Sequence, residues 1–163
     1  MKTNLTLRKN NRLKNYDYSS NGVYFITICV KNRQNLFWED NNVDIANKKT
    51  LPLSQIGKTV EKEINTIESF YSSISVDKYV IMPNHLHNII KIDKDNKKDS
   101  KDSPSISRIV QQFKGSISKK IKSSIWQKLF HDHIIRNEDD YIKICEYIDN
   151  NPIAWDKDCY YQE

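Results

Sequence analysis

The chain has 163 residues, of which 37% are hydrophobic and 29% charged, a balance that fits one globular domain and excludes a largely disordered chain. Lysine and arginine number 26 against 21 aspartate and glutamate, a net charge of +5 that favours polyanionic partners where it is clustered and otherwise only aids solubility. The three cysteines lack CxxC spacing, and no segment is apolar enough for a signal peptide or a membrane span, so we expect a cytoplasmic protein without a disulfide framework or membrane contact.

The first half of the chain predicts an arm, a strand and a helix. Residues 1–22 are polar and basic and end in turn-forming residues at 19–22, which predicts an arm ahead of the domain. The β-branched and aromatic run 24–30 predicts a strand. In 54–71 apolar residues recur every three or four positions, which predicts an amphipathic helix capped near Ser54.

The middle of the chain predicts a hairpin. Residues 76–82 and 85–92 are apolar runs separated by Pro83 and Asn84, two residues that favour a tight turn. The segment 94–101 is almost wholly polar and predicts a solvated loop.

The last part predicts a helix, a short strand and a final helix. Residues 106–121 have apolar side chains on one side and follow a capping Ser105, although Gly115 weakens the middle of this helix. Residues 131–136 predict a strand, and 138–151 a helix that ends before a proline.

The order of these elements is β-α-β-β-α-β with one further helix. It predicts an α+β, ferredoxin-like fold, in which an antiparallel sheet carries helices on one face. We expect one domain over 23–155 and a tail over 156–163. A fold of this kind hosts many chemistries, so the function has to come from particular residues.

Two histidines at the start of a predicted strand are a candidate metal site. His85 and His87 are two residues apart, so both imidazoles lie on one face and can reach one ion. Such pairs also occur on strand surfaces without a metal, and the spacing alone is a weak signal.

Tyr147 and Asn151 are the second candidate pair, one turn apart on the final helix. The spacing suits a nucleophile beside a metal ligand. It equally suits a core tyrosine and an asparagine that caps the helix before Pro152.

Four ordered segments, at 24–27, 82–87, 125–136 and 147–152, resemble a known family: YFIT, MPNHLH, IWQKLFHDHIIR and YIDNNP. Together they resemble the one-tyrosine HUH transposases of insertion sequences, in particular the REP-associated tyrosine transposases. The resemblance extends over about 12–155, and the separation of the segments matches as well as their order.

The resemblance implies a metal-dependent enzyme that cleaves single-stranded DNA and transfers the strand through a 5′-phosphotyrosine. It implies Tyr147 as the nucleophile, His85 and His87 as metal ligands, and Asn151 as the third ligand. The expected cofactor is Mg²⁺ or Mn²⁺ and the expected partner is single-stranded or hairpin DNA, with either a monomer or a homodimer compatible with the sequence.

Lys114 and Arg136 are predicted to contact DNA phosphates, since Lys114 lies on a polar face of the helix predicted over 106–121 and Arg136 on the predicted strand near the final helix. Two rival functions fit the same fold. One is a domesticated DNA- or RNA-binding protein that does not cleave, and the other is a metal-dependent hydrolase that uses water as its nucleophile.

Overall fold

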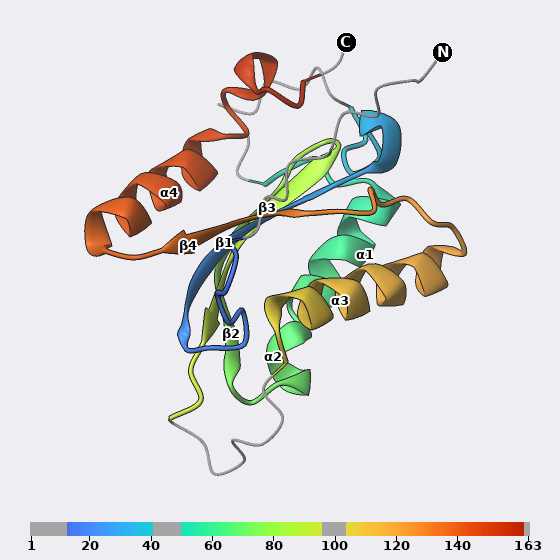
Figure 1. Ribbon diagram of the computed structural model, residues 1–163. Coiled ribbons are helices and arrows are strands. Elements are labelled where there is room, and N and C mark those ends of the chain that lie inside the picture. The colour runs from blue at the N-terminus through green and yellow to red at the C-terminus, as the bar shows by residue number, and fades with distance from the viewer. Residues whose placement is uncertain (1–12, 41–49, 96–103, 162–163) are drawn as a thin grey trace, which may run out of the picture.

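The computed structural model describes residues 13–40, 50–95 and 104–161 (Figure 1). Its centre is a four-stranded antiparallel sheet in the order β2-β3-β1-β4. The strands are β1 (Gly22–Cys29), β2 (Ile74–Ile81), β3 (His85–Ile92) and β4 (His131–Ile135). This is the α+β, ferredoxin-like arrangement that the order of elements predicted, and the prediction is confirmed.

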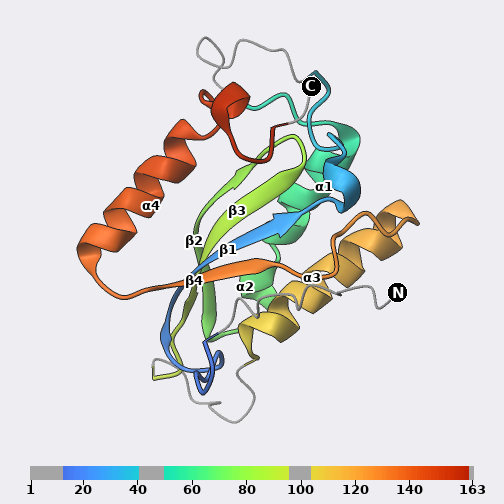
Figure 2. The ribbon, with the colours of Figure 1, turned by 45° about the horizontal axis from the view of Figure 1, so that its top comes forward.

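The helices form a layer on each side of the sheet, so the expectation that they cover one face only is wrong for the final helix (Figure 1). One face is covered by α1 (Gln55–Ile64), the short α2 (Ile67–Phe70) and α3 (Ile106–Ile121), and α4 (Glu138–Asn150) lies on the opposite face beside β2 (Figures 1 and 2). Two 3-10 turns complete the described elements, η1 (Lys31–Arg33) and η4 (Trp155–Lys157). No helix in the described part of the chain is long and apolar enough to span a membrane.

The helix predicted over 54–71 is split in two. Ser54 caps α1 as expected, since its hydroxyl accepts from the backbone N–H of Gly57 at 3.1 Å. At the other end, the Thr66 hydroxyl donates to the carbonyl of Glu63 at 2.8 Å. A side chain that takes up a helical carbonyl competes with the next helical turn, and the chain resumes as the separate α2.

Side chains along β1 alternate between the two faces of the sheet, so the main apolar core and the candidate site lie on opposite faces. The residues beneath α1 and α3 are fully buried: Tyr24, Ile26 and Ile28. Thr27 and Cys29, which alternate with them along the strand, point to the other face and are the register partners of His87 and His85 on β3. The candidate histidines therefore face α4, opposite the main apolar core.

Contacts with the edge strand β2 anchor α4. Asp77 lies at a bulge in β2 and accepts a hydrogen bond from the Tyr141 hydroxyl on α4. The next residue, Lys78, forms an ion pair with Asp149 at 2.8 Å. These two contacts fix the helix that carries Tyr147 along the sheet.

Candidate active site

The two candidate histidines meet where β3 begins, directly after the turn at Pro83 and Asn84. His85 is fully buried and His87 is 2% exposed. Their Nε2 atoms lie 3.0 Å apart. Two ligands at right angles around an ion with bonds of about 2.1 Å also lie about 3 Å apart, so this spacing fits one shared divalent ion.

Asn84 fixes the tautomer of His85. The Asn84 amide nitrogen donates to the carbonyls of Arg33 at 3.2 Å and Tyr160 at 2.8 Å, which turns its carbonyl oxygen toward Nδ1 of His85 at 2.9 Å. A carbonyl oxygen only accepts, so the His85 proton sits on Nδ1 and the lone pair of Nε2 points at His87. This is the tautomer that a metal ligand needs.

The Thr27 hydroxyl is compatible with either tautomer of His87. Its hydroxyl lies 2.8 Å from His87 Nδ1 and can donate or accept. When it donates, the His87 Nε2 proton bonds to His85. When it accepts, Nδ1 carries the proton and Nε2 offers a second lone pair to an ion.

Both imidazoles are held neutral. Burial lowers the pKa of His85 and of His87 to about 3, with the positive charge of Arg33 adding to the effect at His85. Neutral imidazoles are the form that binds a metal ion, so at neutral pH no proton has to leave before binding.

Asp158 brings a carboxylate to the histidines. It follows η4, its Oδ2 lies 3.9 Å from His85 Nε2, and one ligand atom from each of His85, His87 and Asp158 lies within 4.8 Å of the others. The backbone N–H of Tyr160 donates to Oδ1 at 2.7 Å and holds the carboxylate in place. These three residues form a cluster that could hold a metal ion.

Asn151, the third ligand implied by the resemblance, lies beside this carboxylate. Its amide nitrogen donates to Asp158 Oδ2 at 2.9 Å, and its Oδ1 is buried without a hydrogen-bond partner in the described structure. An unpartnered buried oxygen on a side chain that binds the Asp158 carboxylate fits a divalent cation.

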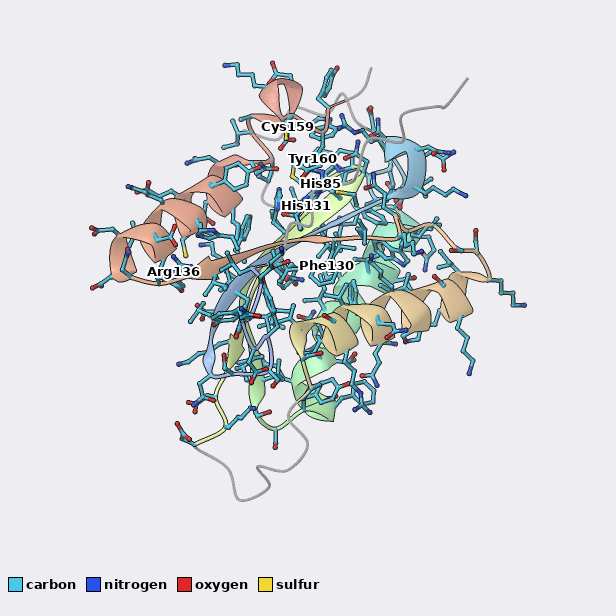
Figure 3. All side chains as sticks on the ribbon, viewed as in Figure 1. His85, Phe130, His131, Arg136, Cys159 and Tyr160 are labelled. Carbon is cyan, nitrogen blue, oxygen red and sulfur yellow. The ribbon has the colours of Figure 1, made fainter. Side chains whose placement is uncertain are left out.

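Sequence reasoning placed Asp158 in a tail and did not select it. Its distance in sequence from His85 hides the contact, and its spacing from the neighbouring residues gives no sign of a metal ligand. Figure 3 shows the outcome, with Cys159 and Tyr160 of the same segment lying close above His85.

Tyr147 reaches the site from α4. Its hydroxyl lies 3.3 Å from His87 Nε2, and the residue is 42% exposed, so a bound molecule has access to it. Burial, and then the charge of Asp158, raise the pKa of Tyr147 to about 12, against an opposing contact with the Asn151 amide. The phenol therefore needs added positive charge before it can act as a phenolate.

Aromatic packing joins the nucleophile to the histidines. The Phe25 ring stacks on His87 with 5.2 Å between centroids and meets the edge of Tyr147 at 6.2 Å. On the other side, Tyr160 covers His85 at 4.4 Å. A cavity of about 300 Å³ adjoins Tyr147 and is lined by Asn150, Asn151, Ala154, Lys157, Asp158 and Cys159.

The two predicted DNA contacts lie outside this cluster. Lys114 is half-buried on α3, where its ammonium donates to the carbonyls of Gln127 at 2.9 Å and Leu129 at 3.3 Å. Arg136 is exposed just after β4 (Figure 3). It lines a separate cavity of about 400 Å³ together with residues that include His133.

Comparison with known proteins gives one sequence relative and two solved structures, while no family model matches the chain. An uncharacterized protein of Haemophilus influenzae is 36% identical, over 94% of this chain and 93% of its own length. The structure of a REP-associated tyrosine transposase bound to a REP hairpin has 21% identity and a TM-score of 0.60, over 88% of this chain and 73% of that one. A candidate transposase from Deinococcus radiodurans is more distant, with 12% identity and a TM-score of 0.49 over 85% of this chain.

The match to the REP-associated tyrosine transposase shows the fold. The chain has the fold of the REP-associated tyrosine transposases, as the four sequence segments led us to expect. It belongs to the same family as the Haemophilus influenzae protein.

Proposed function

We propose that the protein is a tyrosine transposase that cleaves single-stranded DNA and transfers the strand. The observation that carries this proposal is the position of the Tyr147 hydroxyl, 3.3 Å from His87 Nε2, where His87, His85 and Asp158 converge. The similar fold of a transposase bound to a REP hairpin supports DNA with a hairpin or repeat as the partner.

The residues of the cluster would hold one divalent ion. His85 and His87 offer Nε2 lone pairs, Asp158 offers a carboxylate, and Asn151 offers its unpartnered Oδ1. Imidazole and oxygen donors together suit Mn²⁺ and Mg²⁺. When bound, such an ion supplies positive charge that stabilises a phosphate oxygen and a phenolate.

Tyr147 performs the covalent step. Its hydroxyl oxygen attacks the phosphorus of the scissile phosphodiester and loses its proton, while the bond from phosphorus to the 3′-oxygen breaks. The departing oxygen takes up a proton and becomes a free 3′-hydroxyl, and the 5′-phosphate stays on Tyr147. Attack by another 3′-hydroxyl reverses the step and joins two strands without ATP.

The residues of the site differ in their exposure to solvent, and this difference matches their proposed roles. The histidines are closed off from solvent, which favours stable ligand positions, whereas Tyr147 is half-exposed and accessible to a strand. Asn151 contacts both the carboxylate and the environment of the phenol, and thereby couples the metal ligands to the nucleophile.

The test uses a DNA hairpin with single-stranded flanks, labelled at either end, together with Mn²⁺. A 5′-phosphotyrosine predicts that the 3′ label becomes attached to the protein, while the 5′ label appears on a shorter free strand. Tyr147→Phe should form no adduct, and Tyr160→Phe and Tyr161→Phe are matched controls that should keep it.

The rival functions give other results. A non-cleaving binding protein forms no product with either label. A hydrolase shortens the DNA without an adduct and continues to do so in Tyr147→Phe, and either result would replace the proposal.

A further inference from the structure

A cavity of about 360 Å³ lies in the layer of α1, α2 and α3, on the face of the sheet opposite α4 (Figures 1 and 2). It forms where the chain leaves α1 at Thr66 and resumes as α2, beside α3. A cavity of about 150 Å³ already binds a benzene ring, so this one has room for a larger ring system with a short tail. Most of its wall is apolar, from Ile67, Phe70, Tyr71, Ile109 and Phe113.

One wall of this cavity carries a buried carboxylate. Glu63 is 5% exposed, and its two oxygens accept hydrogen bonds from the Ser116 hydroxyl and the Lys120 ammonium. Burial alone would raise the pKa of Glu63, but these two contacts lower it, so the carboxylate is ionised at neutral pH. An ionised group in an apolar wall attracts a cation more strongly than the same group does in water.

Lys120 approaches this carboxylate from the solvent side. Its side chain is 49% exposed, against 6% for the side chain of Glu63, and Lys120 is not one of the residues that line the cavity. An exposed lysine regains its hydration when it leaves an ion pair, so the separation costs little free energy. A cation that enters the cavity can therefore take the place of Lys120 at the carboxylate.

Aromatic rings border the space that such a cation would occupy. Phe70 is 75% exposed, a high value for a residue type that is usually buried, while Phe113 is buried and Tyr71 is half-buried. The faces of aromatic rings attract ammonium groups, and aromatic cages of this kind bind organic cations. The apolar body of a ligand would also cover the exposed Phe70 ring.

We infer that this cavity binds a small organic cation, in which an aromatic or alkyl body carries an ammonium group. The ammonium would donate to the Glu63 carboxylate, and the body would pack against Phe70 and Phe113. The carboxylate would select the cation over a neutral or anionic molecule of the same shape. The inference does not rest on the proposed function, because no residue of the candidate active site lines this cavity.

The experiment compares three molecules that share one ring system: tryptamine, a cation; indole, which is neutral; and indoleacetate, an anion. Their binding to the whole protein is followed by proton–nitrogen correlation NMR, which reports both the affinity and the amides that shift. Tryptamine should bind with a dissociation constant on the order of 0.1–1 mM. It should bind about tenfold more tightly than indole, and indoleacetate should not bind measurably. The shifted amides should be those of α2 and the first half of α3.

Paired variants test each group of the cavity. Lys120→Ala should increase the affinity for tryptamine severalfold, because it frees the carboxylate, whereas Lys119→Ala removes the same charge from the next position of α3 and should change it little. Glu63→Gln should lower the affinity for tryptamine to that for indole. Phe70→Ala should weaken both ligands about tenfold, and Leu129→Ala, which removes an exposed apolar side chain outside the cavity, should weaken neither.

Thermal melting checks that each variant is folded. Phe70 and Lys120 are exposed, so their variants decide the question even if Glu63→Gln does not fold. Equal affinity for tryptamine and indole, no measurable binding of tryptamine, or binding that Phe70→Ala and Lys120→Ala leave unchanged would each overturn the inference. Shifts confined to the surroundings of Tyr147 would place the cation in the active site instead. Self-association that Phe70→Ala abolishes would show that a second copy of the chain covers the cavity.

Discussion

Asn84 supports three groups of the site at once, so its removal is a sharp test of how the metal ligands are held. It is 1% exposed, its carbonyl accepts from His85 Nδ1, and its amide donates to the carbonyls of Arg33 and Tyr160. Asn84→Ala deletes all three contacts. His85 is then no longer restricted to the tautomer that directs Nε2 at His87.

The size of the effect follows from the number and exposure of these bonds. Each buried hydrogen bond contributes about 1 kcal/mol, and a group left unpaired costs about 1–3 kcal/mol. Arg33 is exposed and Tyr160 half-buried, so water can replace the lost donors at their carbonyls, whereas His85 is fully buried. We expect the free energy of unfolding to fall by about 2–4 kcal/mol and Mn²⁺ affinity to fall about 10- to 100-fold.

Urea denaturation and calorimetric titration with Mn²⁺ measure the two effects separately. Asn84→Asp is the matched control, because its carboxylate still accepts from His85 Nδ1 but no longer donates to the two carbonyls. It should lose stability and retain metal affinity. Wild-type Mn²⁺ affinity in Asn84→Ala, or equal loss of affinity in both variants, would refute the role assigned to Asn84.

Three further predictions concern the third ligand, the pH dependence and the packing. Asp158→Asn should weaken Mn²⁺ binding in calorimetry more than Asn151→Ala, because it removes the one anionic ligand of the cluster; the reverse order would make Asn151 the principal third ligand. Burial alone would raise the pKa of Glu63, but hydrogen bonds from Lys120 and Ser116 lower it below 4.5, so the stability it contributes is present above that pH and lost as pH falls through the lowered pKa. Urea midpoints of wild type and Glu63→Gln should therefore converge in acid, and a constant difference would contradict this. A Cβ on Gly57 would lie 2.2 Å from the Phe37 carbonyl oxygen, so Gly57→Ala should lower the free energy of unfolding by about 2 kcal/mol or more, whereas Gly115→Ala, with open space around it, should not destabilise the protein in the same assay.

The fold could be predicted from the sequence because the apolar residues recur at clear helical and strand spacings. The helix predicted over 106–121 matches α3, and the hairpin around Pro83 matches the junction of β2 and β3. The break between α1 and α2 was missed, because it depends on one threonine hydroxyl. The bulge at Asp77 was missed as well, because it serves a contact with Tyr141 that lies far along the chain.

The candidate site was accessible only in part. The spacing of His85 and His87 predicts a shared face, and the structure brings them and Tyr147 together, while their chemical roles stay predictions. Thr27 carried no signal as a partner of His87, because strand register sets that contact. Asn84 was read as a turn residue, and its side-chain contacts become visible only in three dimensions.

The arrangement separates the groups that would bind metal from the group that would react. The two histidines lie at the start of β3. Their positions are fixed by strand pairing, because Thr27 and Cys29 of β1 are their register partners. Tyr147 lies on a helix whose position depends on distant contacts at the edge strand β2, where Lys78 pairs with Asp149. A loosened α4 would therefore move the nucleophile and leave the paired imidazoles in place, so that loss of reactivity and loss of metal binding are separable properties of this fold.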